Sequence, residues 1–176
     1  MEEAEIRRLA GTIATTRDEA EADEAWGQVR PLGAEVVPYL AAAYPEAGRY
    51  QGRVRLVFHS IKFARSSDAA FDLGVAATDD RATLVRYRAC GLLAYSLRRD
   101  AIPVLEKALQ HPDPATVDDA RFAIRAIKAR NHHLFVDRTG SGRTHWVVNP
   151  GDDPINADAG DRMSIMAGFL SRRLKR

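Results

Sequence analysis

Hydrophobic residues recur at helical spacing along most of the chain. Between Ala82 and Asp113, apolar positions lie three or four residues apart in two runs, which Arg98, Arg99 and Asp100 separate. This spacing puts the apolar side chains of each run on one face of a helix. Pro103 follows the break, where proline is tolerated because the first turn of a helix leaves its N–H groups without intrahelical partners. The stretch therefore predicts two amphipathic helices joined by a short turn.

The same pattern occurs twice upstream. Three segments share one register and open on Glu35, Asp68 and Asp100, which follow one another at nearly equal intervals. A helix-sized run precedes each segment. These runs are Asp23 to Leu32, Arg53 to Arg65 and Thr83 to Arg99. A period near thirty with one helical hairpin per unit indicates a stack of helix pairs, an α-solenoid, in which each pair covers the apolar face of the next.

The central unit carries a resemblance to a known family. Its residues Val85-Arg86 and Ala101-Ile102-Pro103-Val104-Leu105 resemble a HEAT repeat of the PBS-lyase HEAT-like type, and the resemblance covers roughly residues 20 to 131. The middle copy lacks the proline. The resemblance implies a mainly α fold, a right-handed α-solenoid of HEAT-like helical pairs.

Both ends of the chain depart from the repeat. Residues 1–16 predict a short terminal helix that shields the first repeat. After a last helix from about Thr116 to Arg130, the runs 134–138 and 143–148 flank a glycine turn and predict a β-hairpin. Residues 163–170 predict a short C-terminal helix. We thus expect a helical array over 1–131, a hairpin cap over 132–150, and an acidic loop with a basic terminal helix over 151–176, together forming one domain.

Composition is that of an ordinary globular protein. The 176 residues are 45% hydrophobic and 28% charged, with a net charge of +2. The lone cysteine excludes an internal disulfide framework. The N-terminal stretch Met1-Glu2-Glu3-Ala4-Glu5 is acidic and lacks the basic start and apolar run of a signal peptide. We expect a cytoplasmic protein that makes no use of a membrane.

Residues that could carry chemistry do not form a recognisable catalytic pattern. His132, His133 and His145 with Asp137 match no tight metal-ligand spacing, and we interpret them as hydrogen-bonded or exposed groups. Cys90 lies in an apolar stripe with no histidine at helical spacing, which is typical of a core thiol. The glycine-rich turn at 139–142 lacks the Gly-Lys-Ser/Thr of a phosphate loop. We therefore expect no catalytic residues, no metal and no cofactor.

Charge is divided between the two helices of each pair. The second helices and their turns, 35–46, 68–80 and 100–113, hold nine acids and one lysine, a net charge of −8. The first helices, 49–65, 81–99 and 118–130, hold 14 basic and two acidic residues, a net charge of +12. In HEAT-like solenoids the second helices line the concave surface, so the resemblance implies an acidic inner face and a basic outer face. Solvated arginines and ordinary acidic caps would produce part of the same division.

These features predict a non-enzymatic protein-binding module, an adaptor in the manner of HEAT-like proteins. By family analogy, a specialised version is an immunity or antitoxin protein that occludes a basic bacterial toxin. The candidate binding residues are second-helix acids and the two arginines at the predicted hairpin tip. They are Asp72, Asp79, Asp80, Glu106, Arg138 and Arg143.

Two other functions stay open. HEAT-like DNA glycosylases grip nucleic acid on a basic concave surface, which the expected acidic inner face disfavours, but the basic first helices and the tail 172–176 keep a nucleic-acid role in view. HEAT-like bilin lyases attach a chromophore to a partner protein, and no pocket signature in the sequence points to that role.

Overall fold

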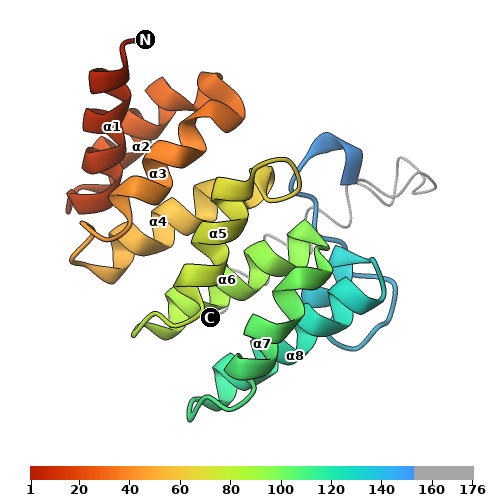
Figure 1. Cartoon of the computed structure of the whole chain (residues 1–176). Helices are drawn as coiled ribbons and strands as arrows, with labels where there is room; N and C mark the ends of the chain where they lie inside the picture. Colours follow the sequence, from red (N-terminus) through yellow and green to blue (C-terminus); the bar gives the residue numbers. More distant parts are fainter. Residues whose placement is uncertain (153–176) are drawn as a thin grey trace.

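A computed structural model describes residues 1–152, and this part of the chain is mainly helical (Figure 1). The α-helices are α1 (Glu3–Thr15), α2 (Glu19–Val29), α3 (Val37–Ala43), α4 (Tyr50–Ser60), α5 (Asp68–Ala77), α6 (Thr83–Ser96), α7 (Ile102–Ala108) and α8 (Pro114–Lys128). The 3₁₀ turns are η1 (Arg30–Val36), η2 (Ile61–Phe63), η3 (Arg99–Ala101), η4 (His132–Phe135) and η5 (Pro150–Asp152). The predicted all-α character is confirmed for these residues.

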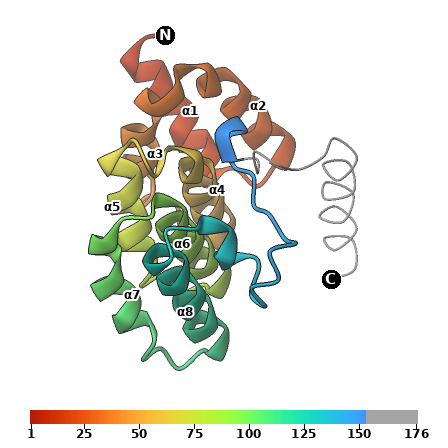
Figure 2. The same ribbon diagram turned by 90° about the vertical axis from the view of Figure 1, so that its right-hand side faces the viewer.

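The helices form two layers. Helices α1, α4, α6 and α8 pack side by side in sequence order, and α3 packs beside α5 in the second layer, where α7 follows. Figure 2 shows α5 and α7 on one side of the molecule and residues 136–152 running along the other. The chain alternates between layers from α3 onward, since α5 also packs on α6 and α7 on α8.

Residues that favour helix starts and turns lie where the helices begin and the chain changes direction. The Asp18 carboxylate caps α2 by accepting hydrogen bonds from the backbone N–H groups of Ala20 (2.8 Å) and Glu21 (3.4 Å). Pro103 lies in the first turn of α7, as predicted. At Gly33, with φ of 63°, the chain turns between α2 and α3, a conformation that L side chains rarely adopt.

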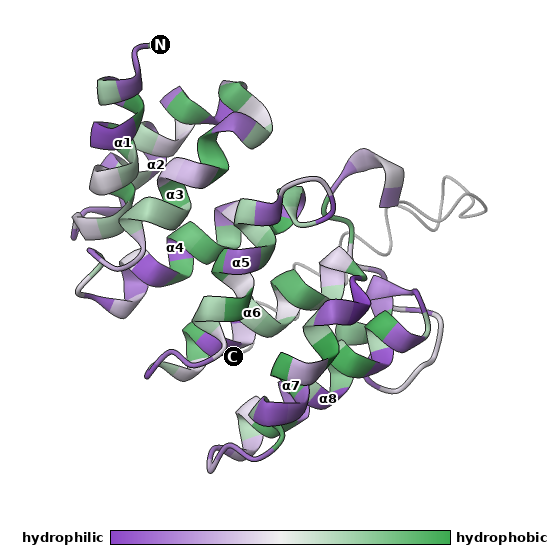
Figure 3. Cartoon of the chain, in the orientation of Figure 1, coloured by the Kyte–Doolittle hydropathy of each residue, from purple (hydrophilic) through white to green (hydrophobic). Residues whose placement is uncertain are grey.

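Helix α4 joins two hydrophobic clusters. Its Leu56 belongs to the cluster formed with α1, α2 and α3, whereas the adjacent Val57 belongs to the cluster formed with α5 to α8. Both side chains are fully buried. Figure 3 shows hydrophobic and hydrophilic residues mixed along every helix, as expected for helices that bury one face and expose the other. Helix α4 thus contributes to the core of both halves of the molecule.

The predicted β-hairpin is wrong, because no strand forms within residues 1–152. Side chains, rather than a partner strand, satisfy the backbone groups of this segment. The Asp137 carboxylate accepts hydrogen bonds from the N–H groups of Ser141 (3.1 Å) and Gly142 (2.7 Å). The backbone N–H of Trp146 donates to the Nδ1 ring nitrogen of His133 (2.9 Å). Residues 136–152, which we call the wrap, thus lie as an irregular segment over the α4–α6–α8 layer (Figure 2).

The predicted acidic loop and C-terminal helix lie almost entirely outside the described residues, which end at Asp152. None of the helices between residues 1 and 152 is both long and apolar enough to cross a membrane.

Close packing of α1 against α4 generates a test of the fold. A Cβ atom at Gly52 would lie 1.7 Å from the carbonyl oxygen of Ala14, whereas a Cβ at Gly27, on α2, would meet no atom within 4 Å. We expect Gly52→Ala to lower the free energy of unfolding by about 1–3 kcal/mol or more, because a backbone must move. Gly27→Ala should instead raise it by about 0.5–1 kcal/mol through helix propensity. Urea unfolding measures both, and equal effects would contradict the packing.

Candidate partner-binding surface

A buried arginine links the second and third helix pairs. Arg53 of α4 is only 7% exposed, and its guanidinium makes two hydrogen bonds to the Asp80 carboxylate, at 2.6 and 3.1 Å. It also donates to the carbonyl oxygens of Ala47 and Gly48. The Tyr44 hydroxyl donates to the same carboxylate at 2.6 Å. Burial would raise the pKa of Asp80, but the bonds from Arg53 and Tyr44 outweigh it and hold that pKa below its usual value.

The next helix pair repeats this arrangement. Arg86 of α6 is 4% exposed and donates to the Asp113 carboxylate at 2.7 Å and to the Thr116 hydroxyl at 2.8 Å. It also donates to the Thr83 hydroxyl at 3.0 Å and, at 2.7 Å, back to the Asp80 carbonyl oxygen. We call the pairs Arg53–Asp80 and Arg86–Asp113 the arginine ladder. Each pair ties a helix of the first layer to the turn that opens the following helix of that layer.

The ladder ends with its charges reversed. Asp119 follows Arg86 in the sequence at the same interval at which Arg86 follows Arg53, so it occupies the next position, and it is 5% exposed. Arg138 of the wrap supplies the cation, with a nitrogen 2.5 Å from the carboxylate and its guanidinium 4.9 Å from the Phe122 ring. Burial raises the pKa of Asp119 although Arg138 opposes it. Arg138 was predicted, together with Arg143, at the tip of the hairpin. Instead it is tied to α8, while Arg143 is exposed.

The four predicted acids fall into different environments. Asp80 was predicted to be one of the exposed binding acids, and its expected exposure is wrong, since its side chain is 5% exposed and held by the ladder. Asp79 is 70% exposed and pairs with Lys107 at 2.6 Å. Asp72 on α5 and Glu106 on α7 are exposed, and neither has an ion pair among the described residues.

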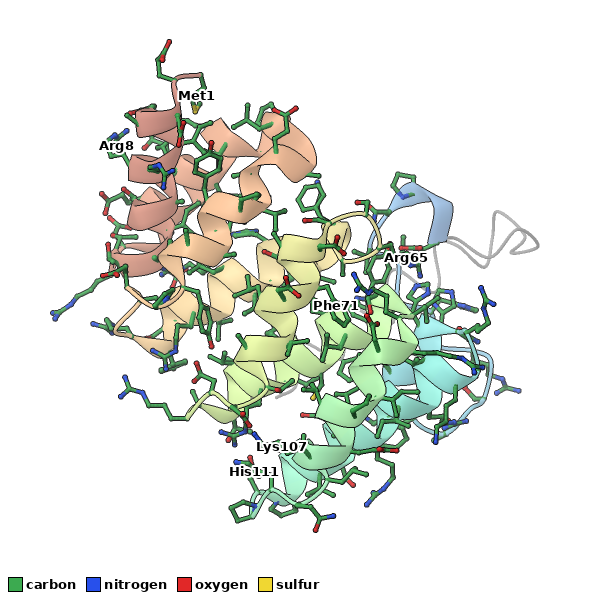
Figure 4. The ribbon with its side chains drawn as sticks, viewed as in Figure 1. Met1, Arg8, Arg65, Phe71, Lys107 and His111 are labelled. Atoms are coloured by element: carbon green, nitrogen blue, oxygen red, sulfur yellow. The ribbon has the colours of Figure 1, made fainter. Side chains whose placement is uncertain are left out.

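We define the α5–α7 face as the exposed side chains of those two helices and of η3. Two ion pairs, each at 2.6 Å, connect α5 and α7 or the residues next to them: Arg98, just before η3, pairs with Asp68, and Lys107 pairs with Asp79, just after α5. Figure 4 labels Lys107 at one end of α7. Five of the nine acids predicted for the acidic face are paired with cations, so its charge is smaller than expected. Those without an ion pair among residues 1–152 are Glu35, Glu46, Asp72 and Glu106.

A second polar cluster fastens the end of the wrap. The Asp152 carboxylate, 3% exposed, accepts hydrogen bonds from the Tyr95 hydroxyl (2.8 Å) and from Arg65 (3.1 Å), which Figure 4 labels. Arg65 also donates to His132 Nδ1 at 2.9 Å and stacks on the Tyr95 ring, 4.1 Å from its centroid. Asn149 donates to the carbonyl oxygen of Lys62 at the end of α4. The wrap is therefore held to α6 and to the segment that follows α4 by hydrogen bonds, of which the bond from Tyr95 to Asp152 is buried.

Burial keeps the two adjacent histidines neutral, and each accepts a hydrogen bond at Nδ1. An arginine can only donate, so His132 Nδ1 accepts from Arg65, and its Nε2–H donates to the Trp146 carbonyl oxygen at 2.8 Å. His133 Nδ1 likewise accepts from the Trp146 N–H. Burial lowers the pKa of His132, and it lowers the pKa of His133 to about 4. Protonating either Nδ1 would break a hydrogen bond that holds the wrap.

Three other features could have carried chemistry: the Cys90 thiol, a hollow at the start of α4, and groups of metal-ligating side chains. Burial raises the pKa of the Cys90 thiol to about 12, so the thiol stays protonated and inert. A hollow of about 370 Å³ lies at the start of α4, but Arg53 and Arg81 on its wall both donate to the Gly48 carbonyl oxygen. Within residues 1–152, no three His, Cys, Asp or Glu side chains gather as metal ligands would.

The acids of the ladder belong to a short repeated sequence motif that the spacing of apolar residues does not reveal. Asp80-x-Ala82-Thr83 recurs as Asp113-x-Ala115-Thr116 in the next unit of the repeat. Asp80 accepts from the Ala82 N–H and Asp113 from the Ala115 N–H, both at helix starts. Counting the repeat from these acids would have separated Asp80 from its exposed neighbour Asp79.

We found no matching family model, no matching curated protein and no matching solved structure for this chain.

Two neighbouring acids provide a matched test of the ladder. Asp80→Asn removes the charge opposite buried Arg53, and we expect it to lower the free energy of unfolding by about 3–5 kcal/mol, because a buried cation loses its partner. Asp79→Asn removes an exposed partner of Lys107 and should cost only about 0–1 kcal/mol. Urea unfolding at neutral pH compares the two variants. A similar small loss for both would show that Arg53 does not depend on Asp80.

The wrap histidines predict that stability falls on acidification. The pKa of His133 in the folded protein, about 4, lies below the ordinary value of 6.5, so the unfolded chain binds protons first. Stability is then complete above about pH 6.5 and is lost as pH falls towards 4. His132 acts in the same direction. Thermal unfolding followed between pH 7.5 and pH 4.5 measures the loss, which we expect to be on the order of 1–2 kcal/mol for His133 after allowing for its partial exposure.

His133→Asn is the control for this prediction. The asparagine oxygen can accept the Trp146 N–H but cannot be protonated in this range. The variant should lose less stability on acidification than the natural protein, with His59 and His132 contributing the remainder, since burial also lowers the pKa of His59 to about 4. An unchanged pH dependence in His133→Asn would rule out His133 as a source of the effect.

Proposed function

We propose that this chain is a non-enzymatic protein-binding module whose binding surface is the α5–α7 face. The observation that supports it is the placement of Asp72 and Glu106, which are exposed and have no ion pair among the described residues. Along the sequence, each lies between residues of the two ion pairs that connect α5 and α7. A partner with basic side chains could form ion pairs with these two carboxylates, because neither is paired with a cation of the described residues.

We further propose that the two layers are a right-handed α-solenoid of HEAT-like pairs. Support comes from the regular repeat of the ladder and from the order α1, α4, α6, α8 in the first layer. Repeat stacks of this kind offer extended surfaces of exposed second helices, and protein binding is their common use. By analogy with small HEAT-like proteins, the partner would be a basic bacterial toxin that this chain occludes as an immunity protein in the cytoplasm.

A specific observation also favours a second candidate, binding of nucleic acid. The end of α8 exposes Lys128 and Arg130, and neither has an ion pair among residues 1–152. Arg143 of the wrap is also exposed. Cations of this kind bind phosphate with an affinity that falls steeply as salt rises. Retention of a random duplex at low salt and its release at moderate salt would mark this second function.

Charge reversal on the α5–α7 face tests the proposed function. Immobilised protein is exposed to lysate of its host at low and moderate salt, and retained proteins are identified by mass spectrometry. We expect one stoichiometric basic protein to survive moderate salt. Asp72→Lys with Glu106→Lys should weaken its binding at least tenfold, about 1.4 kcal/mol, while the thermal midpoint stays nearly unchanged because both side chains are exposed.

The matched control reverses two exposed acids elsewhere. Asp23→Lys with Glu24→Lys, on α2, changes the net charge equally and should leave the partner bound. Equal loss in both double variants would indicate general electrostatic attraction rather than a binding face. Full retention by Asp72→Lys/Glu106→Lys would remove the α5–α7 face from consideration.

A further inference from the structure

An apolar stripe lies exposed on the layer opposite the α5–α7 face. Phe58 of α4 is 45% exposed and Leu84 of α6 is 44% exposed. The Arg88 guanidinium lies 4.9 Å from the Phe58 ring centroid and 5.4 Å from that of Tyr87, so its flat face connects the two helices. Leu84 is three residues before Tyr87 and four before Arg88, which places all three on one side of α6.

The wrap extends this stripe. A Cβ atom at Gly91, one turn beyond Tyr87, would lie 3.5 Å from the Trp146 ring, so the wrap meets α6 where the stripe ends. The next residue, Val147, is 44% exposed. We define the apolar stripe as Phe58, Leu84, Tyr87 and Val147. Large apolar side chains that lie exposed on neighbouring elements in this way are typical of a covered or binding region.

The described chain ends near the C-terminal end of α6, at the other end of this helix from Leu84. Asp152 is bonded to Tyr95 near the end of α6, and Asn149 is bonded to Lys62, one turn beyond Phe58 on the α4 side. From Asp152, the chain continues to Arg176. The distance along α6 from Tyr95 back to Leu84 is about 16 Å at the rise of an α-helix. About ten residues of extended chain reach up to about 33 Å, so residues 153–162 can carry the following segment to the stripe.

The segment after residue 162 has the chemistry to cover the stripe. It carries apolar residues at spacings of three and four, the pattern of one helical face, and acids precede it. The apolar residues are Met163, Ile165, Met166, Phe169 and Leu170, and the acids are Asp153, Asp158 and Asp161. Methionine and aromatic side chains adapt well to an irregular apolar surface with a guanidinium among its rings. The acids would face the basic first helices, including Lys62.

We propose that residues 163–170 of the same chain bind across the apolar stripe, on the side of α4 and α6 opposite the proposed binding face. The segment covers Phe58, Leu84 and Val147 and leaves Asp72 and Glu106 exposed. This proposal is independent of the partner-binding function, because the two surfaces belong to different layers.

A nitroxide in the segment of the full-length chain tests this placement. The chain with Ser164→Cys is labelled at residue 164, while Cys90 stays unmodified because its side chain is fully buried. We expect loss of the Leu84 and Val147 methyl signals in NMR spectra of the oxidised label and their return when the label is reduced. The methyl signals of Val104, on α7, should persist. Retained Leu84 and Val147 signals, or loss at Val104 instead, would overturn the proposal.

Two further samples make the result specific. Phe169→Ser in the labelled chain should restore the lost signals, whereas Phe169→Leu, which keeps an apolar side chain, should not. The second sample mixes nitroxide-labelled chain at natural isotope abundance with isotope-labelled chain that carries no nitroxide. Signal loss in the mixture would show that a second copy covers the stripe and would overturn intramolecular binding. Unchanged spectra in the mixture support it.

Discussion

The structure depends on the burial of Arg53 and Arg86 between helix pairs. An arginine keeps its charge in a protein, so each buried guanidinium needs a carboxylate and carbonyl oxygens at fixed positions. Asp80 and Asp113 meet that need at the turns that open α6 and α8, and each also accepts a backbone N–H there. Each carboxylate thus fixes the backbone at the start of one helix and holds the preceding helix of the same layer. These pairs therefore set the spacing between α4, α6 and α8 in the first layer, and the positions of α5 and α7 depend on that spacing.

The last helix of the first layer shows how the series of buried charge pairs ends. At the third ladder position Asp119 stands in place of arginine, and Arg138 brings the missing cation from the wrap. Side chains then bind the backbone of the wrap along its length, through Asp137, His133 and Asp152. An irregular segment can lie on the helices in this way because its N–H groups find acceptors without a neighbouring strand.

The helices were predictable because burial of one face imposes a period of three and four residues, and this periodicity also marked the turn at Pro103. The hairpin was not, since residues 143–148 have the composition of a strand, while the backbone N–H groups of Trp146 and Val148 bond to the side chains of His133 and Asp152. Composition also could not separate Asp79 from Asp80. The Asp79 side chain is 70% exposed and the Asp80 side chain 5% exposed, and in the sequence only the repeated Asp-x-Ala-Thr distinguishes them.

The central claim is that buried arginine–aspartate pairs hold successive helix pairs together, and a double-mutant cycle tests it most directly. Urea unfolding of Arg86→Met, Asp113→Asn and the combined variant gives the coupling free energy between the two residues. The ladder predicts that each single change is strongly destabilising and that the combined change costs less than their sum, with a coupling of about 2–3 kcal/mol. Losses that add within about 0.5 kcal/mol would mean that the two residues act independently, and they would contradict the account.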